Sequence, residues 1–203
     1  MSNHYFSPHP KSREERGLIR AKIRGLDLEF TTNSGVFSHT RVDNGTRLLA
    51  ESMMVPIEGR LLDLGCGYGV LGIVAAKASP RLEVVMTDVN QRATTLAEEN
   101  LKRNGVVNAR VVVGSLYEPV EGEMFDAIVT NPPISAGIGK TVSPIVSGSP
   151  DHLNSGGSLQ LVVQSNKGGR TVACLVEAAF GEAEVLARGS GYRVLRGVKK
   201  QAA

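Results

Sequence analysis

Short apolar runs alternate with amphipathic stretches through most of the chain. Five apolar runs have the length and β-branched content of buried strands, at 60–64, 83–87, 111–113, 125–130 and 159–163. Three stretches with helical spacing follow the first, second and fifth of these runs, at about 69–78, 91–104 and 169–180. The alternation predicts an α/β fold with a mostly parallel sheet and helices on both faces.

Two further short runs, 184–188 and 192–197, flank Gly189-Ser190-Gly191 near the end of the chain. A short glycine turn joins antiparallel strands, because a parallel connection needs a crossover of a dozen or more residues. The prediction is therefore a seven-stranded sheet with an antiparallel C-terminal strand pair. Several glycines interrupt residues 135–157, where we expect a functional or mobile loop with a short helix.

The N-terminal part of the chain has a different pattern. Residues 26–30 alternate like a half-buried strand, and Val36-Phe37 is expected to begin a return strand after a short turn. Asp43 is the expected N-cap of a helix over about 44–54, whose apolar side lies against the main sheet.

The length of 203 residues suits one main domain, 58–203, preceded by an extension, 1–57. The net charge of +3 and the isoelectric point near 9.0 permit a polyanionic partner without requiring one. Basic residues gather in an arm at 1–24 and again from Arg188 onward. Each group is either a solvated surface or a phosphate-binding one, and the sequence leaves both interpretations open.

The two cysteines, Cys66 and Cys174, lie in unrelated patterns and suggest neither a disulfide nor a metal site. No apolar run is long enough to span a membrane, and residues 1–6 do not resemble the start of a signal peptide. We therefore expect a cytoplasmic protein without a metal ion.

The strand predicted at 60–64 runs into a glycine-rich turn and then into a helix. Gly65, Gly67 and Gly69 allow the backbone to turn tightly and to approach a ligand, and Asp63 stands where it can orient that turn. This arrangement predicts a nucleotide-like ligand at the carboxyl edge of the sheet. The spacing alone is a weak signal, because such a turn also has a purely structural use.

A carboxylate ends the next predicted strand. Asp88 lies 19 to 23 residues after the three glycines. At that distance it can accept hydrogen bonds from both hydroxyls of a ribose. The alternative is that Asp88 caps the helix beginning near Gln91, and the two roles can coexist.

Asn131-Pro132-Pro133 directly follows the strand predicted at 125–130. Together with the glycine turn and Asp88, this motif resembles the class I S-adenosylmethionine-dependent methyltransferases that act on planar amino nitrogens. Two segments, Phe30–Ser38 and Val42-Asp43-Asn44-Gly45-Thr46-Arg47-Leu48-Leu49, are similar to those of the small-domain methyltransferases related to the ribosomal RNA guanine-N2 enzymes. The resemblance covers nearly the whole chain and implies a Rossmann-like methyltransferase fold.

The resemblance also implies roles for individual residues. S-adenosylmethionine, the implied cofactor, would be bound by Asp63, Gly65, Cys66, Gly67, Tyr68, Gly69, Asp88, Val89, Ser115, Leu116 and Asn131. The implied catalytic residues are Asn131, Pro132 and Pro133. Ser115 stands where the family usually has an adenine-binding acid, and the sequence leaves open whether it replaces that contact.

The chemistry of methyl transfer explains the motif. The methyl group of a sulfonium is already activated, whereas the lone pair of an exocyclic amine is delocalised into its base. The side-chain oxygen of Asn131 and the carbonyl of Pro132 can accept the two amine hydrogens and so direct the lone pair at the methyl group. Proline removes N–H donors, so this rim only accepts. Positioning and electrostatics then supply most of the rate without a strong general base.

Several positions depart from the relatives. Ile134 stands where many have a stacking aromatic residue, Ser135 stands where the compact subfamily has an arginine, and Lys140 is displaced by two residues. The remaining candidates for contacting a base or a phosphate, most of them also ordinary surface residues, are Phe37, His4, His9, His39, Arg41 and Arg47.

The expected reaction is methyl transfer to an exocyclic amine of a nucleic-acid base, with guanine N2 of ribosomal RNA as the best single candidate. A flipped or splayed RNA base would reach Asn131, and the N-terminal extension would form part of the substrate side. One alternative is a protein glutamine or small-molecule N-methyltransferase, because a planar amide presents the same hydrogens. Another is a cofactor-binding, RNA-associated module with little catalysis. The oligomeric state stays open.

Overall fold

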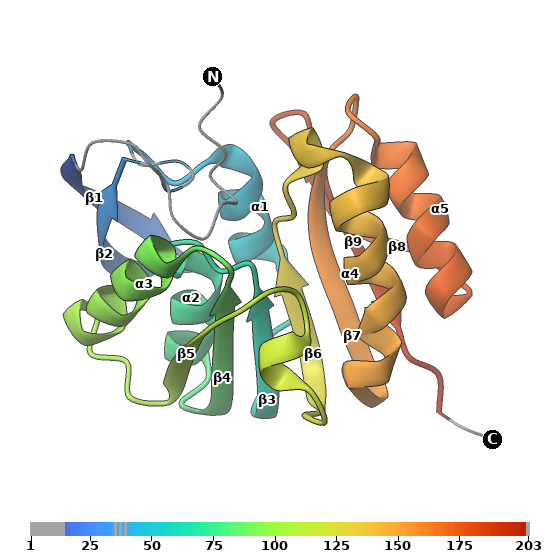
Figure 1. Ribbon diagram of the computed structural model, residues 1–203, viewed down its shortest axis with the longest axis horizontal. Coiled ribbons are helices and arrows are strands. Elements are labelled where there is room, and N and C mark those ends of the chain that lie inside the picture. The colour runs from blue at the N-terminus through green and yellow to red at the C-terminus, as the bar shows by residue number, and fades with distance from the viewer. Residues whose placement is uncertain (1–14, 35, 37, 39, 202–203) are drawn as a thin grey trace.

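The computed structural model describes residues 15–34, 36, 38 and 40–201, and Figure 1 shows the arrangement of the elements. The central sheet has seven strands in the order β5-β4-β3-β6-β7-β9-β8. Their bounds are β3 Glu58–Leu64, β4 Arg81–Asp88, β5 Ala109–Val113, β6 Phe125–Thr130, β7 Leu153–Gln164, β8 Glu184–Gly189 and β9 Tyr192–Val198. Pairings among β3 to β7 are parallel, and those of β9 with β7 and β8 are antiparallel. The predicted seven-stranded architecture is confirmed.

Helices cover both faces of the sheet. One face carries the helices α1 Asn44–Ser52, α2 Val70–Ala78 and α3 Gln91–Arg103, and the other carries α4 Ser143–Gly148 and α5 Gly169–Phe180 (Figure 1). Side chains of successive strand residues alternate between the two cores, so that Leu61 packs with the α1–α3 side and Leu62 with the α4–α5 side. Both strand faces are therefore apolar, which explains the continuous apolar runs in the sequence.

A separate two-stranded sheet corrects the prediction for the N-terminal part. Its strands are β1 Arg16–Ile23 and β2 Leu26–Asn33, joined by a turn at Arg24 and Gly25 in which both residues have positive φ. The partner of β2 thus precedes it, and residue 36 lies in no strand, so the predicted return strand is wrong at that residue. β1 lies within the stretch predicted as a basic arm, and most of its side chains do face solvent.

Two asparagines of α3 attach this hairpin to the main domain. The side chain of Asn100 accepts a hydrogen bond from Thr31 N (2.7 Å) and donates one to Thr31 O (2.9 Å). Asn104 forms the same pair of bonds with the backbone of Glu29 (3.1 and 2.7 Å). The side-chain amides therefore pair with β2 as a neighbouring strand would, which satisfies backbone groups on its free edge.

The prediction for α1 is confirmed within two residues. Asp43 has an extended backbone and its Oδ1 accepts hydrogen bonds from Gly45 N (2.9 Å) and Thr46 N (3.1 Å), as an N-cap does. After the helix, the buried amide of Gln160 on β7 bonds both Met54 N and Met54 O. The connection from α1 to β3 is thereby held against the sheet.

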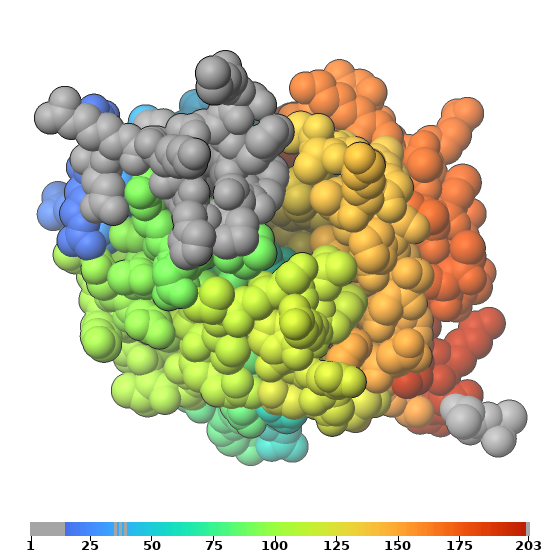
Figure 2. All heavy atoms as spheres, viewed as in Figure 1, coloured from blue at the N-terminus to red at the C-terminus, as the bar shows by residue number. Residues whose placement is uncertain are grey.

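The irregular stretch after β6 is a series of short turns around α4. Residues 134–136 and 149–152 form 3₁₀ turns, and 138–142 form a π-helical turn that leads into α4. β7 already begins at Leu153, so the predicted irregular region ends several residues early. In Figure 2 the gold atoms of this stretch form a continuous band beside the orange atoms of α5.

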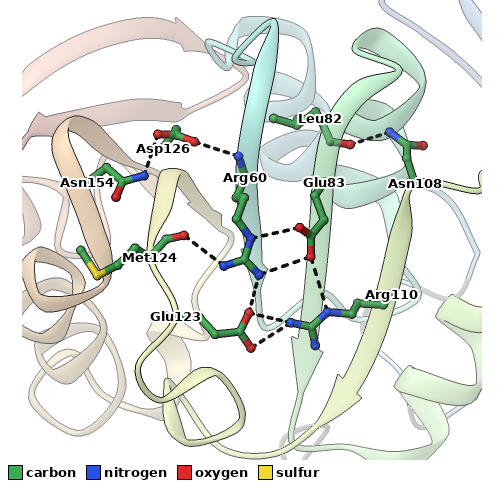
Figure 3. Close-up of polar contacts among 9 residues, drawn as sticks. All are labelled: Arg60, Leu82, Glu83, Asn108, Arg110, Glu123, Met124, Asp126 and Asn154. Carbon is green, nitrogen blue, oxygen red and sulfur yellow. Dashed lines mark hydrogen bonds and ion pairs between the residues drawn. The ribbon is translucent and has the colours of Figure 1, made fainter.

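An ion-pair network links β3, β4 and β5 near the amino-terminal ends of these strands (Figure 3). Arg60 on β3 pairs with Glu83 on β4 (3.2 Å) and with Glu123, and Arg110 on β5 also pairs with Glu123 (2.6 Å). Nearby, Asp126 accepts hydrogen bonds from Arg60 N and from the side chain of Asn154, both at 2.8 Å. These contacts lie at the end of the strands opposite to the glycine turn, so they stabilise the sheet without entering its carboxyl edge.

Candidate functional site

A cavity of about 510 Å³ opens at the carboxyl ends of β3, β4, β6 and β7. Its volume is in the range of small-molecule and cofactor sites. Segments that follow these strands supply most of the wall, which includes Gly65, Cys66, Gly67, Tyr68, Asp88, Asn90, Asn131, Pro132, Pro133, Ile134, Ser135, Val163, Gln164 and Lys167. The topology thus brings together the glycine turn, Asp88 and the Asn-Pro-Pro motif, as the sequence predicted.

The glycine turn is held tightly against β4. The amides of Gly65 and Cys66 both donate to Thr87 O at 2.8 Å. Gly69 has φ +98°, and a Cβ there would lie 2.8 Å from Met86 Cε. Only glycine fits both the left-handed backbone and the space at residue 69, which lets α2 begin directly over β4.

Asp63 lies beneath this turn and does not line the cavity. Its carboxyl group is almost fully buried, and Oδ2 accepts a hydrogen bond from Gly72 N at 2.8 Å. Burial raises the pKa of Asp63 to about 7, and the bond from Gly72 opposes that rise. Oδ1 has no hydrogen-bond partner among the described residues, so a cation in the cavity above would stabilise this carboxylate.

Asp88 lies in the cavity wall and bonds backbone amides on both sides of it. Oδ2 accepts from Gly67 N (2.8 Å) and Oδ1 from Asn90 N (2.9 Å). Burial raises the pKa of Asp88, and the backbone N–H groups oppose the rise. The carboxylate, which has about four acceptor positions, retains room for a hydrogen bond from a ligand. The N-cap of α3 is Asn90, whose side chain accepts from Arg92 N and Ala93 N, so the alternative role of Asp88 as that cap is wrong.

Of the two larger side chains of the turn, Tyr68 is buried and Cys66 is partly buried in the cavity wall. Burial, together with the carboxylates of Asp63 and Asp88, raises the pKa of the Cys66 thiol. Burial likewise raises the pKa of Tyr68, whose ring packs edge-on against Phe30 of the hairpin at 5.7 Å between centroids. The N-terminal hairpin therefore packs against the glycine turn through the contact between Phe30 and Tyr68.

Five predicted cofactor residues are not among the residues that line the cavity. They are Asp63 and Gly69 of the glycine-turn segment, Val89, and the exposed pair Ser115 and Leu116. The chain does pass beside the site there, because Gly114 N donates to Asp88 O at 3.0 Å. Leu116 has φ +50°, a strained value for leucine.

The Asn-Pro-Pro motif forms a compact turn at the end of β6. Ile134 N donates to Pro132 O (2.9 Å), and Pro133 between them has φ −76° and ψ 78°. This is an inverse γ-turn, which the proline ring favours because it fixes φ near −65°. The Pro132 carbonyl already accepts one bond and keeps a second lone pair for a ligand.

Asn131 itself contacts the N-terminal extension. Its Nδ2 donates to Thr46 Oγ1 at 2.9 Å and lies 3.5 Å from Asp43 Oδ1. Sequence reasoning noted Asp43 and Thr46 only as a cap and as part of a family segment. Three cavity residues were not predicted, because they belong to no motif in the sequence: Gln164 at the end of β7, Lys167 in the turn after it, and Tyr192 at the start of β9.

Many basic residues of the two basic stretches form ion pairs or hydrogen bonds within the protein. In the described part of the N-terminal stretch, 1–24, Arg16 pairs with Glu99 and Arg20 pairs with Glu29. In the basic stretch from Arg188 onward, Arg196 pairs with Glu184, and Lys199 Nζ donates to two backbone carbonyls. Arg41, Lys140 and Lys167 are exposed, and in the described ranges no acid pairs with them.

Some candidates cannot be placed. Phe37, His4, His9 and His39 lie outside the described residues. Within the described ranges, no group of three or more His, Cys, Asp or Glu side chains is arranged to hold a metal ion, and no helix is long and apolar enough to cross a membrane.

The sheet order, the glycine turn over β4 and the Asn-Pro-Pro turn after β6 together define a class I methyltransferase. Comparison with known proteins identifies the family within this class. The family model of the methyltransferase small domain matches residues 27–196, and the chain belongs to this family.

Relatives support the same family. The uncharacterized protein YbxB of Bacillus subtilis (strain 168) is 37% identical over 98% of this chain and 100% of its own length. Ribosomal RNA small subunit methyltransferase C of Hamiltonella defensa is 36% identical over 83% of this chain and 49% of its own length. The chain thus spans about half the length of the ribosomal RNA methyltransferases that it matches.

Solved structures agree. The T. thermophilus 16S rRNA N2 G1207 methyltransferase (RsmC), solved in complex with AdoMet and guanosine, has a TM-score of 0.80 and 28% identity, covering 95% of this chain and 52% of that one. A methyltransferase from Pyrococcus furiosus has a TM-score of 0.65 at 21% identity over 77% of this chain and 82% of that one, which shows the shared fold.

Proposed function

We propose that the protein transfers a methyl group from S-adenosylmethionine to an exocyclic amine of an RNA base, with guanine N2 of ribosomal RNA as the target. The observation that carries this proposal is the position of Asn131-Pro132 in the wall of the same cavity as the glycine turn and Asp88. The family supports it, as does the structural relative solved with AdoMet and guanosine.

The residues present fit the cofactor. The turn at Gly65–Gly69 would hold the methionine end, and Asp88 would accept hydrogen bonds from the ribose. The carboxylate of Asp63, whose Oδ1 is unpartnered among the described residues, provides negative charge beneath a cationic ligand. When bound, S-adenosylmethionine supplies the activated methyl group. Val89, Ser115 and Leu116 stay proposals for the adenosine end, because they do not line the cavity as it stands.

The Asn131-Pro132 rim would act on the substrate amine. The Asn131 side-chain oxygen and the Pro132 carbonyl would each accept one amine hydrogen, which directs the nitrogen lone pair at the methyl group. Ile134 and Val163, which also line the cavity, are apolar and would help to exclude water from the reacting nitrogen.

The substrate is proposed to reach this rim from the side of the N-terminal extension, 1–57, with the methyltransferase domain at 58–203. The exposed cations Arg41, Lys140 and Lys167 are candidates for contacting RNA phosphates. Lys167 lines the cavity itself. A ribosomal RNA substrate implies action in the cytoplasm.

The test is transfer of a radioactive methyl group from S-adenosylmethionine to total RNA and to total protein from cells lacking the gene. We expect label in RNA, released as N2-methylguanosine after digestion to nucleosides. Label in protein would instead support the glutamine alternative, and binding of the cofactor without any transfer would support a binding module with little catalysis.

Cofactor affinity should depend on pH. The pKa of Asp63 is about 7 without ligand, and a sulfonium cation nearby would favour the carboxylate. Binding should therefore release a proton below pH 7. If binding lowers the pKa by one unit, affinity should rise by about fourfold from pH 5.5 to pH 7. Calorimetry in two buffers of different ionisation enthalpy measures both quantities.

Two comparisons isolate the Asp63 carboxyl group in that experiment. S-adenosylhomocysteine lacks the sulfonium charge and should show a shallower rise. Asp63→Asn keeps an acceptor for Gly72 N but does not ionise, so its affinity should vary less with pH than that of the wild type. An equally steep rise in Asp63→Asn would assign the effect to another group, such as Asp88, whose charge also acts on Asp63.

A further inference from the structure

The side chain of Asn131 has two chemically opposite ends, and the proposed reaction uses only one of them. An amide oxygen accepts the substrate hydrogens, whereas an amide nitrogen in the same place would repel them. Rotation by 180° about the last side-chain bond exchanges the two ends. The reaction therefore requires something in the protein to hold the amide in one of its two orientations.

The N-terminal end of α1 provides that constraint. Asn131 Nδ2 donates to Thr46 Oγ1 at 2.9 Å and lies 3.5 Å from Asp43 Oδ1. Asp43 Oδ1 is a carboxylate oxygen and can only accept, so the inverted amide would place two acceptor oxygens against each other. The contact to Asp43 thus selects the orientation, and the shorter bond to Thr46 holds it.

Both acceptors are themselves fixed. Asp43 Oδ1 accepts from Gly45 N (2.9 Å) and Thr46 N (3.1 Å) as the cap of α1. Thr46 is 8% exposed, and within α1 its rotamer freedom is restricted by β-branching. The two acceptors, Asp43 Oδ1 and Thr46 Oγ1, are therefore held in place by the N-terminus of α1.

The helix end is in turn packed against β9. A Cβ on Gly45 would lie 2.8 Å from Tyr192 Cε1, so the backbone of α1 and the tyrosine ring approach as closely as glycine permits. The Tyr192 hydroxyl accepts a hydrogen bond from Gln164 Nε2 at 2.8 Å. The Tyr192 ring therefore packs directly against the first turn of α1. Asn131 bonds this helix end only through Nδ2, and its Oδ1 accepts none of the hydrogen bonds found among the described residues.

From this geometry we propose that Thr46 and Asp43 are positioning residues that orient the Asn131 amide for the proposed transfer. They act through Asn131 and need not touch the substrate amine. The proposal rests on the proposed function for its consequence in catalysis, but the hydrogen bond that it invokes can be measured without activity. It also makes the N-terminal extension a part of the catalytic unit, since α1 belongs to residues 1–57.

The kinetic test uses Thr46→Val, which keeps the shape of the side chain and removes the acceptor. We expect kcat for methyl transfer to fall roughly tenfold to a hundredfold, the loss of one hydrogen bond to the orienting group, with the affinity for S-adenosylmethionine unchanged. Thr46→Ser restores the hydroxyl and should recover most of kcat. Thr95→Val, which removes an exposed hydroxyl from α3 far from the motif, is the matched control and should behave as the wild type.

The second readout is the Asn131 side-chain NH₂ in a ¹⁵N NMR spectrum, assigned by its loss in Asn131→Ala. In the wild type its protons should exchange slowly with water, and in Thr46→Val they should exchange at least several-fold faster. Unchanged exchange, or full kcat in Thr46→Val with active wild type, would overturn the positioning role. If the wild type methylates no RNA, the proposed function fails, and the exchange measurement alone then decides whether Thr46 orients Asn131.

Discussion

Asn131→Ala should abolish methyl transfer while the protein keeps its affinity for S-adenosylmethionine. Removing the side chain deletes the proposed acceptor for one amine hydrogen, and with it the contact that directs the lone pair at the methyl group. Loss of one preorganised hydrogen-bonding group in an active site typically costs about a hundredfold to a thousandfold in kcat. The measurement pairs initial rates of label transfer to RNA with calorimetry of cofactor binding.

Asn154→Ala is the matched control for that variant. Asn154 also uses its amide to bond one carboxylate, Asp126 (Figure 3), but it lies near the start of β7, at the opposite end of the sheet from Asn131. It should lose some stability and keep its activity. If Asn131→Ala instead loses cofactor affinity in proportion to its activity, Asn131 belongs to the cofactor site alone and its catalytic role is wrong.

Asp88→Ala should weaken cofactor binding by roughly a hundredfold, because hydrogen bonds to a charged group contribute about 1.5–3 kcal/mol. The variant removes the proposed ribose acceptor. It also removes the bonds to Gly67 N and Asn90 N that hold the glycine turn in shape. Calorimetry with S-adenosylhomocysteine measures the change without turnover.

Asp126→Ala is the control that distinguishes a loss of cofactor affinity from a loss of folding stability. Asp126 likewise accepts two hydrogen bonds, from Arg60 N and Asn154 Nδ2, at the far end of the strands. Both variants should lower the denaturation midpoint, and only Asp88→Ala should lower the cofactor affinity. Unchanged affinity in Asp88→Ala would reject the ribose role.

Short-range patterns predicted the main domain well. Strands buried on both faces appear as continuous apolar runs, and Pro80 and Gly105 end the helices where the backbone requires it. The glycine turn, Asp88 and the Asn-Pro-Pro motif could be located in the same way, since each ends or directly follows a strand and parallel strands present their carboxyl ends at one edge. The predicted starts and ends of strands were less accurate, most of all for β7, whose first residues lie among glycines.

The hairpin was the largest error, and its cause is instructive. β1 is mostly exposed and carries arginines that pair with acids from β2 and α3, so its sequence looks like a solvated arm. The asparagines that bond β2 lie about seventy residues away on α3. Side-chain amides that replace a missing strand leave no periodic signal, and the pairing emerges only when α3 packs against the hairpin.

The sequence by itself thus determined the class of fold, the family resemblance and three of the segments that line the cavity, because each depends on local patterns and on strand order. Only the tertiary structure decided which of the predicted residues meet. It placed Asn131 against Thr46 and Asp43, set Asp63 beneath the cavity floor, and left Val89, Ser115 and Leu116 outside the lining. The physical reason is that these relations join residues distant in the chain, through hydrogen bonds and burial that form only when the sheet, α1 and the hairpin pack together.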